Sequence, residues 1–105
     1  SETADHLFVK TGYEQLKVLY DDILYLEAAG NYVTFVLKDR NLLSRSTFAE
    51  VAATLPPHKF VRVHRSYIVA INKIDKVERQ QVTIQKAIVP VSDAYHQNLM
   101  DALKK

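Results

Sequence analysis

The sequence lacks several features on which common classes of protein depend. It has no cysteine and only two glycines among its 105 residues, so it offers no disulfide, no thiolate metal site and little means of building a glycine-rich phosphate loop. No apolar run approaches the roughly 20 residues that span a bilayer, and no signal peptide is visible. These absences favour a cytoplasmic protein with no membrane partner.

A catalytic or metal-binding constellation is also missing. The four histidines have no spacing typical of a metal site, and the motifs GxSxG, Walker A and GxGxxG do not occur. Ser66 lies two residues after His64, but the members of a catalytic triad are assembled in space and not along one segment. We therefore expect no enzyme activity, no metal and no cofactor.

The chain has enough apolar residues for the core of one domain, and its charge is unevenly distributed. Hydrophobic residues make up 48% of the sequence, and the formal net charge is +2. Residues 38–86 hold ten basic and four acidic side chains, a balance of +6, whereas the remainder holds four basic and eight acidic ones, a balance of −4. A basic middle is typical of a surface that binds a polyanion. Basic residues on exposed strand edges, which discourage aggregation, would give the same pattern.

Most of the chain shows the apolar and polar alternation, or the β-branched composition, that predicts short β-strands. The expected strands are 7–11, 15–20, 23–29, 32–38, 42–45 and 60–63. Two further strands, 71–78 and 82–91, are predicted to form a final meander with a turn at 79–81. Segment 64–70 is compatible either with a continued strand or with a turn and a short helix.

Two segments have the helical period instead. Residues 47–55 carry apolar side chains at helical spacing, begin with the capping-box pair Thr47 and Glu50, and end before Pro56. A second helix is predicted from Ser92, a residue type favoured at the N-cap. The predicted fold is therefore mostly β, with antiparallel segments and two short helices.

Segment 60–69, with the sequence FVRVHRSYIV, is the most informative part of the chain. Its alternation ends at His64, Arg65 and Ser66, which a loop at the end of the strand can present. An arginine in that place can donate two hydrogen bonds to a guanine in the major groove.

A second interpretation of the same residues is structural. Arg62 and Arg65 could instead form ion pairs with Glu27 or Asp39, while His64 packs at the edge of the core. The chemistry of the side chains alone leaves both interpretations open.

The same segment resembles the hallmark of the LytTR (LytR/AlgR-type) family of DNA-binding domains. Segment 23–33, ILYLEAAGNYV, is similar to an earlier block of that family, and segment 88–92, IVPVS, is similar to a late one. The three blocks occur in the order and at the spacing of the family. Together with the segments between them they cover about residues 7–100.

The resemblance implies an elongated fold of antiparallel β segments with few helices, which usually follows a receiver domain in bacterial response regulators. It implies binding of double-stranded DNA by two copies on direct repeats, with loops that enter successive major grooves. The expected function is sequence-specific DNA binding as the output domain of a two-component transcription regulator. Because no heptad seam is present, we expect a monomer in the absence of DNA.

Carried over to this sequence, the recognition loops of the family are 31–32, 64–65 and 92–93. The residues expected to contact bases are Asn31, Tyr32, His64, Arg65 and Ser92. The residues expected to contact the DNA backbone are Lys38, Arg45, Arg62, Ser66 and Lys73. The sequence departs from the family at Ala70, where Asn is common, and at Asp93, where Arg is frequent. Phosphate repels an acid, so Asp93 is expected to serve the N-terminus of the last helix instead.

The alternative function is a small β protein-interaction module that binds a peptide at an exposed sheet edge. Strong salt dependence with a sequence preference would distinguish DNA binding from this alternative. In either case we expect residues 1–6 to be a linker or an expression remnant and residues 7–105 to form the domain.

Overall fold

A computed structural model describes residues 5–104, within which the chain forms ten β-strands, two α-helices and two single-turn 3-10 helices, η1 and η2. The strands are β1 (His6–Thr11), β2 (Glu14–Leu19), β3 (Ile23–Ala29), β4 (Tyr32–Leu37), β5 (Asn41–Ser44), β6 (Phe60–His64), β7 (Tyr67–Ala70), β8 (Lys76–Val77), β9 (Gln81–Ile84) and β10 (Ala87–Pro90). The helices are η1 (Tyr20–Asp22), α1 (Phe48–Thr54), η2 (Ile71–Lys73) and α2 (Asp93–Leu103). The linker expected at residues 1–6 falls mainly on residues 1–4, which lie outside the described part.

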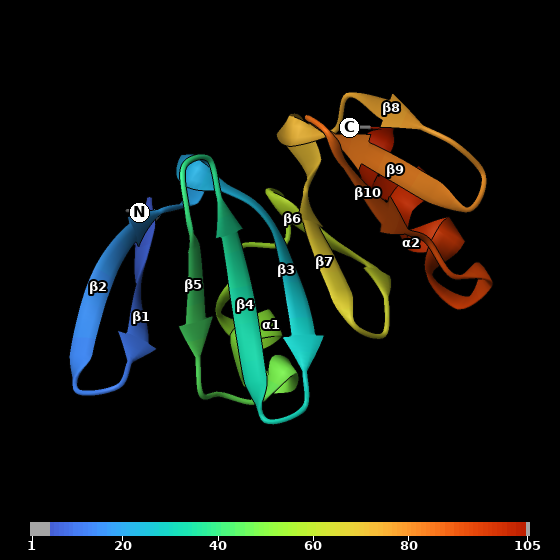
Figure 1. The fold of residues 1–105 in the computed structure, drawn as a ribbon. Coiled ribbons are helices and arrows are strands. Elements are labelled where there is room, and N and C mark those ends of the chain that lie inside the picture. The colour runs from blue at the N-terminus through green and yellow to red at the C-terminus, as the bar shows by residue number, and fades with distance from the viewer. Residues whose placement is uncertain (1–4, 105) are drawn as a thin grey trace.

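The expected mostly β fold is confirmed, and its strands form three antiparallel units (Figure 1). The central sheet has five strands in the order β5-β4-β3-β7-β6. The hairpin β1-β2 lies beside the edge strand β5, and the three-stranded sheet β10-β9-β8 lies on the opposite side, next to β7 and β6. None of the helices in residues 5–104 is both long and apolar enough to cross a bilayer.

The central sheet buries apolar side chains on both faces, which explains why its strands are so rich in valine, isoleucine and leucine. On one face Leu26 and Phe35 pack with α1 and with the hairpin β1-β2. On the other face Val63 and Val69 pack with the C-terminal sheet and with Leu99 of α2. Because each face has its own core, the sheet is held from both sides and its turns start from fixed strand ends.

Two of the expected strands are wrong in extent. Segment 71–78 is not one strand, because η2 takes up its first three residues and β8 has only two. Segment 82–91 is divided into β9 and β10 by a turn in which Gln85 has a φ of 56°. The Gln85 N–H donates to Asp75 Oδ2 at 2.7 Å. Apolar alternation continues across this turn, and no glycine marks it, so the sequence pattern conceals it.

The ambiguous segment 64–70 forms a tight turn followed by a strand. Residues 65–66 connect β6 to β7, with Arg62 paired to Ile68 and His64 to Tyr67. The register shifts between these two pairs, so the hairpin has a bulge just before its turn. This bulge lies within the informative segment 60–69.

Both predicted helices are present, but their caps differ. At α1 the Thr47 N–H donates to Glu50 Oε1 and the Glu50 N–H donates to Thr47 Oγ1, both at 3.1 Å, so the capping box is formed. Ser92 occupies the N-cap position of α2, but its side chain makes no capping hydrogen bond.

Candidate nucleic-acid interface

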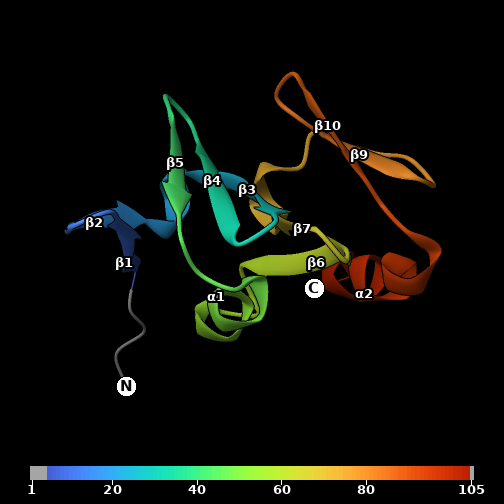
Figure 2. The same cartoon turned by 60° about the horizontal axis from the view of Figure 1, so that its bottom comes forward.

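The strand order brings four connections to one side of the molecule, at the bottom of Figure 1. β3 and β7 are antiparallel neighbours, so the end of β3 lies beside the start of β7. β4 runs back from this side and β5 returns to it, so the end of β5 lies on the same side. We define the loop edge as the β3–β4 turn (30–31), the β5–α1 connection (45–47), the β6–β7 turn (65–66) and the β10–α2 connection (91–92). In Figure 2, where the bottom comes forward, the first, third and fourth connections lie in a row.

The β3–β4 turn presents Asn31 and Tyr32 to solvent. Gly30 has a φ of +62°, a left-handed conformation that glycine adopts without strain and that this two-residue turn requires. Asn31 is exposed, and Tyr32 retains 42% of its surface. Asn31 and Arg45 line the same shallow hollow, so the sheet brings Arg45 beside this turn.

The β6–β7 turn presents Arg65, which is exposed, between the half-buried His64 and Ser66. His64 Nδ1 accepts a hydrogen bond from the Ser66 N–H at 3.1 Å. The proton of the neutral imidazole is therefore on Nε2, which leaves that nitrogen as a donor. The edge of the same ring meets the ring of Tyr67, with centroids 5.5 Å apart.

Backbone hydrogen bonds connect the three recognition loops to one another. The Ala28 N–H, at the end of β3, donates to Ser66 O at 2.8 Å. The Ser92 N–H, just before α2, donates to Val63 O at 2.9 Å. The β6–β7 turn is therefore joined on one side to the strand that leads into the β3–β4 turn and on the other to the β10–α2 connection.

The arginines of the loop edge form no ion pair with an acid of residues 5–104. Arg45 and Arg65 have no carboxylate within 4.0 Å in the described part of the chain, where the ion pairs are Lys38–Asp22, Lys76–Glu78 and His6–Asp5. Glu27, which the structural interpretation offered as a partner for arginine, instead accepts a hydrogen bond from the Tyr67 hydroxyl at 3.2 Å. Burial, followed by the charge of Glu27, raises the pKa of Tyr67.

Two residues expected to contact the DNA backbone lie at the other end of the sheet. Lys38 is in the β4–β5 turn, at the top of Figure 1, and pairs with Asp22 at 3.8 Å. Lys73 ends the 3-10 turn that follows β7, also at that end. The structure therefore does not bring these two lysines together with Asn31, Arg45 and Arg65.

Arg62 is directed at the backbone of the β6–β7 turn. Its Nε donates to His64 O at 3.3 Å, and a second guanidinium nitrogen donates to Arg65 O at 2.6 Å. The guanidinium carbon lies 5.0 Å from the centre of the Phe48 ring and 5.3 Å from that of Tyr95. Four of the ten expected contact residues, His64, Arg65, Ser66 and Arg62, are thus part of one connected cluster.

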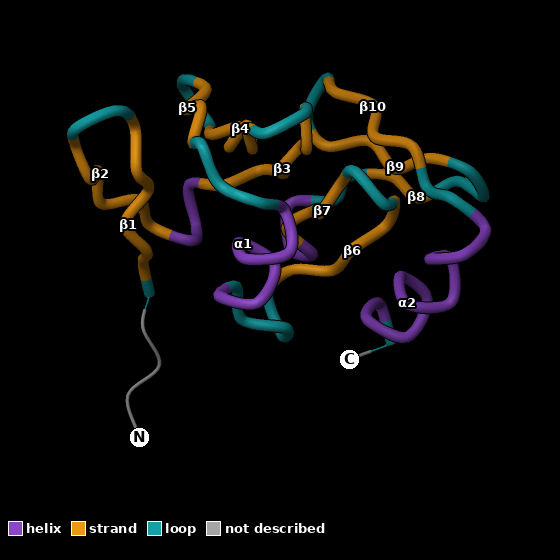
Figure 3. Tube along the Cα trace, turned by 90° about the horizontal axis from the view of Figure 1, so that it is seen from below, coloured by secondary structure: helices purple, strands orange, loops and turns teal. Residues whose placement is uncertain are grey.

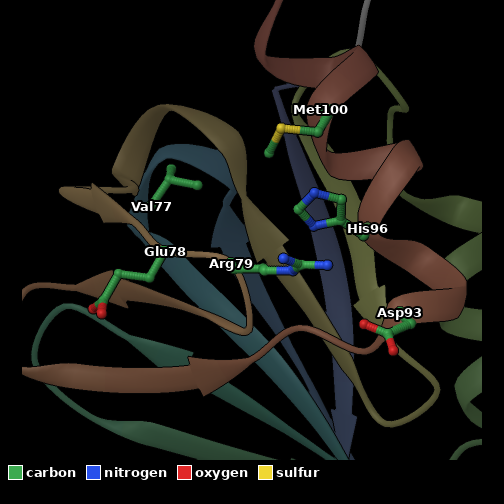
Figure 4. A pocket seen from close by; sticks show the side chains of 6 residues that line it. All are labelled: Val77, Glu78, Arg79, Asp93, His96 and Met100. Carbon is green, nitrogen blue, oxygen red and sulfur yellow. The ribbon is translucent and has the colours of Figure 1, made fainter.

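A basic residue that the sequence did not single out lies beside the β10–α2 connection. Arg79 is exposed in the β8–β9 turn, which the Val91 N–H joins through a 2.8 Å hydrogen bond to Gln80 O. Figure 4 shows its side chain reaching toward α2, across a hollow of about 630 Å³ that Asp93 and His96 also line. The two segments are more than ten residues apart, so no spacing rule could connect them.

His96 Nδ1 is buried and makes no hydrogen bond with any described residue. Residues 5–104 contain no group of three or more histidine, aspartate or glutamate side chains placed to hold a metal ion.

Comparisons with known proteins agree on one family. The family model described as the LytTr DNA-binding domain matches residues 13–104. A response regulatory protein of Vibrio cholerae is 33% identical over 92 residues, which cover 79% of this chain and 35% of that protein. A heme-containing CO-sensing transcriptional regulator of Paraburkholderia xenovorans is 38% identical over 50 residues, covering 48% of this chain and 19% of that protein.

A solved structure has the same fold. It is the LytTr DNA-binding domain of a methyl-accepting/DNA response regulator from Bacillus cereus, with a TM-score of 0.83 over 98% of this chain and 100% of that one. At 23% identity this likeness concerns the fold alone. The chain spans 35% of the length of the Vibrio cholerae relative, so most of that protein has no counterpart in these 105 residues.

Proposed function

The chain belongs to the LytTr DNA-binding domain family, and we propose that its loop edge binds double-stranded DNA with sequence specificity by inserting its turns into the major groove. DNA binding as the output domain of a transcription regulator is the function of this family, and the likeness to a response regulatory protein agrees with it. The alternative of peptide binding at a sheet edge is not favoured.

The observation that carries the proposal is the hydrogen-bonded row of recognition loops, which presents Arg65 and has Arg45 beside it. Arg45 and Arg65 are exposed and have no carboxylate within 4.0 Å among the described residues. Cations without an acidic partner can contribute to DNA affinity by contacting phosphates, because neutralising phosphates releases the condensed counterions of the duplex. Turns held to one another by backbone hydrogen bonds also keep a constant spacing, which the recognition of a base sequence requires.

Each recognition loop has a distinct role in this proposal. Arg65 donates to guanine and Asn31 pairs with adenine, the two bidentate contacts that these side chains make best in the major groove. Tyr32, His64 and Ser92 are proposed to contact further bases. Arg45 and Ser66 hold phosphates, which fixes the register of the protein on the duplex. Arg79 adds a cation beside the third loop, where Asp93 stands.

The dimensions of the domain suit successive grooves. The molecule measures 40 × 35 × 24 Å, and one turn of the duplex is about 34 Å long. We propose that two copies, monomeric when free, bind direct repeats in the cytoplasm. A receiver domain elsewhere in the same protein is proposed as the regulator of this pairing.

The test begins with a duplex selected from a random library by the wild-type domain. Log affinity for that duplex should fall linearly with log salt, with a slope of several units if about four to eight phosphates are contacted. A scrambled duplex should bind more weakly at every salt concentration. Equal affinity for the two duplexes, or no dependence on salt, would contradict the proposal.

Sedimentation tests the pairing separately. The free domain should sediment as a monomer, a duplex with one half-site should bind one copy, and a direct repeat should bind two. A tight dimer without DNA would show that the pairing is a property of the protein and not of the repeat.

A further inference from the structure

Arg62 was expected from the sequence to contact the DNA backbone, but its surroundings are unlike those of a phosphate contact. The residue is half-buried on β6, and two of its nitrogens already donate to the carbonyl oxygens of His64 and Arg65, at 3.3 and 2.6 Å. A guanidinium group has five N–H donors in a fixed plane. Those aimed at the turn are therefore unavailable for a phosphate oxygen in another direction.

Aromatic rings from both helices meet the same group. Phe48 is the first residue of α1, and Tyr95 lies in the first turn of α2; their ring centres are 5.0 and 5.3 Å from the guanidinium carbon. Figure 3 shows the two helices with β6 between them. The cation therefore joins three separate elements to the turn that carries Arg65.

We propose that Arg62 is a positioning residue, which holds the His64–Ser66 backbone in the conformation that recognises a base sequence and makes no DNA contact of its own. The inference rests on the proposed function of the loop edge. Its physical basis is that an ordered loop does not lose conformational freedom when it binds. Without the fork from Arg62, the two carbonyl groups would have to find water, and the Arg65 backbone would sample more conformations.

The decisive variant is Arg62→Lys, which keeps the charge but cannot reproduce a planar fork with two donors. We expect it to weaken binding to the selected duplex about tenfold, a factor that corresponds to roughly 1.4 kcal/mol. Binding to the scrambled duplex and the salt slope should stay unchanged. If Arg62 were a phosphate contact, Arg62→Lys would retain affinity, and Arg62→Met would weaken both duplexes and lower the slope by about one unit; that result would overturn the proposal.

The matched control is Arg40→Lys, the same substitution at an exposed position in the turn at the other end of the sheet. It should leave the ratio of the two affinities unchanged. Tyr95→Leu removes one ring while keeping Arg62, so it should lower the ratio in the same direction but by less, and Tyr95→Phe should behave as wild type. These variants test the proposal even if Arg62→Lys does not fold.

Hydrogen exchange of the free domain tests the positioning role without DNA. The amides of Arg65 and Ser66 should exchange faster in Arg62→Lys than in wild type, while the amides of the β1-β2 hairpin keep their rates. A wild-type domain that fails to discriminate between duplexes would refute the proposed function alone. Unchanged exchange at the turn would refute the positioning role, whatever the wild type binds.

Discussion

The two ends of the central sheet both carry basic residues, but they differ in how those charges are arranged. At the loop edge Arg45 and Arg65 have no acidic partner in the described part of the chain. At the opposite end, which comprises 20–22, 38–40 and 71–73, Lys38 is paired with Asp22, and Asp21 and Asp39 add negative charge. The excess of basic residues in segment 38–86 is therefore divided between two surfaces. At the opposite end Lys38 is paired with an acid, whereas Arg40 and Lys73 form no ion pair within residues 5–104 but lie on a surface that also carries Asp21, Asp22 and Asp39.

Among substitutions at the two ends, Arg65→Ala should have the largest effect on the discrimination between the selected and the scrambled duplex. The substitution removes a proposed bidentate guanine contact, worth about 1–3 kcal/mol of discrimination between the two duplexes. Lys38→Ala at the opposite end should leave that discrimination unchanged. Titration of the three proteins against both duplexes at one fixed salt concentration measures the effect.

Two outcomes would contradict the assignment of Arg65 as a base contact. Equal weakening of both duplexes by Arg65→Ala would make Arg65 a phosphate contact and not a base contact. A large fall in melting temperature would show that Arg65 supports the fold. A fall in melting temperature is not expected, because Arg65 is exposed and its side chain forms no ion pair within residues 5–104.

The sequence predicted the fold class because local patterns determine most of it. Alternating residues predicted most of the central strands within one or two residues, and Thr47 with Glu50 predicted the start of α1. The pattern failed at segments 71–78 and 82–91, where a 3-10 turn and a left-handed Gln85 interrupt apolar runs. Such interruptions depend on tertiary hydrogen bonds, such as the one between Gln85 and Asp75, and the alternation of apolar and polar residues does not reveal them.

The candidate site could be predicted only where one segment contains it. Segment 60–69 identified the turn at Arg65, but no sequence rule could place Arg45 beside Asn31 or Arg79 beside Asp93, because the tertiary arrangement of the strands decides both. For the same reason the sequence could not separate Lys38 and Lys73 from the loop edge. The proposed role of Arg62 could not be predicted from the sequence either, since its contacts come from α1, β6 and α2 together.

A smaller effect, on the salt dependence of binding, should show which of the two ends contacts phosphates. Arg45→Ala should weaken binding to all duplexes alike and lower the salt slope by about one unit, because one phosphate contact is lost. Lys73→Ala, at the opposite end, should change the slope by much less. Affinities measured across a salt series test both variants. An equal fall in slope for the two would mean that DNA also reaches the opposite end.

The smallest binding effect should come from an acid at the loop edge. Glu50 lines the hollow shared by Asn31 and Arg45, and its carboxylate lies near the proposed path of the DNA backbone. Glu50→Gln removes this repulsion, so binding to both duplexes should tighten slightly and equally. Glutamine also completes a capping box, so α1 should stay intact. Asp39→Asn, at the opposite end, serves as the control and should leave affinity unchanged.

The same variant should alter the acid stability of the domain. Hydrogen bonds from the Thr47 N–H and then from the Thr47 hydroxyl lower the pKa of Glu50 below its ordinary value of 4.5. A carboxyl whose pKa is depressed by folding contributes stability above its unfolded pKa, and this contribution is lost as pH falls through the folded value. Wild type should therefore lose the Glu50 contribution below about pH 4.5, whereas Glu50→Gln, which does not titrate, should lose nothing from this site. Urea unfolding at pH 7 and at pH 3.5 measures the difference. If the stability gap between the two proteins is the same at both pH values, the capping box does not depend on the charge of Glu50.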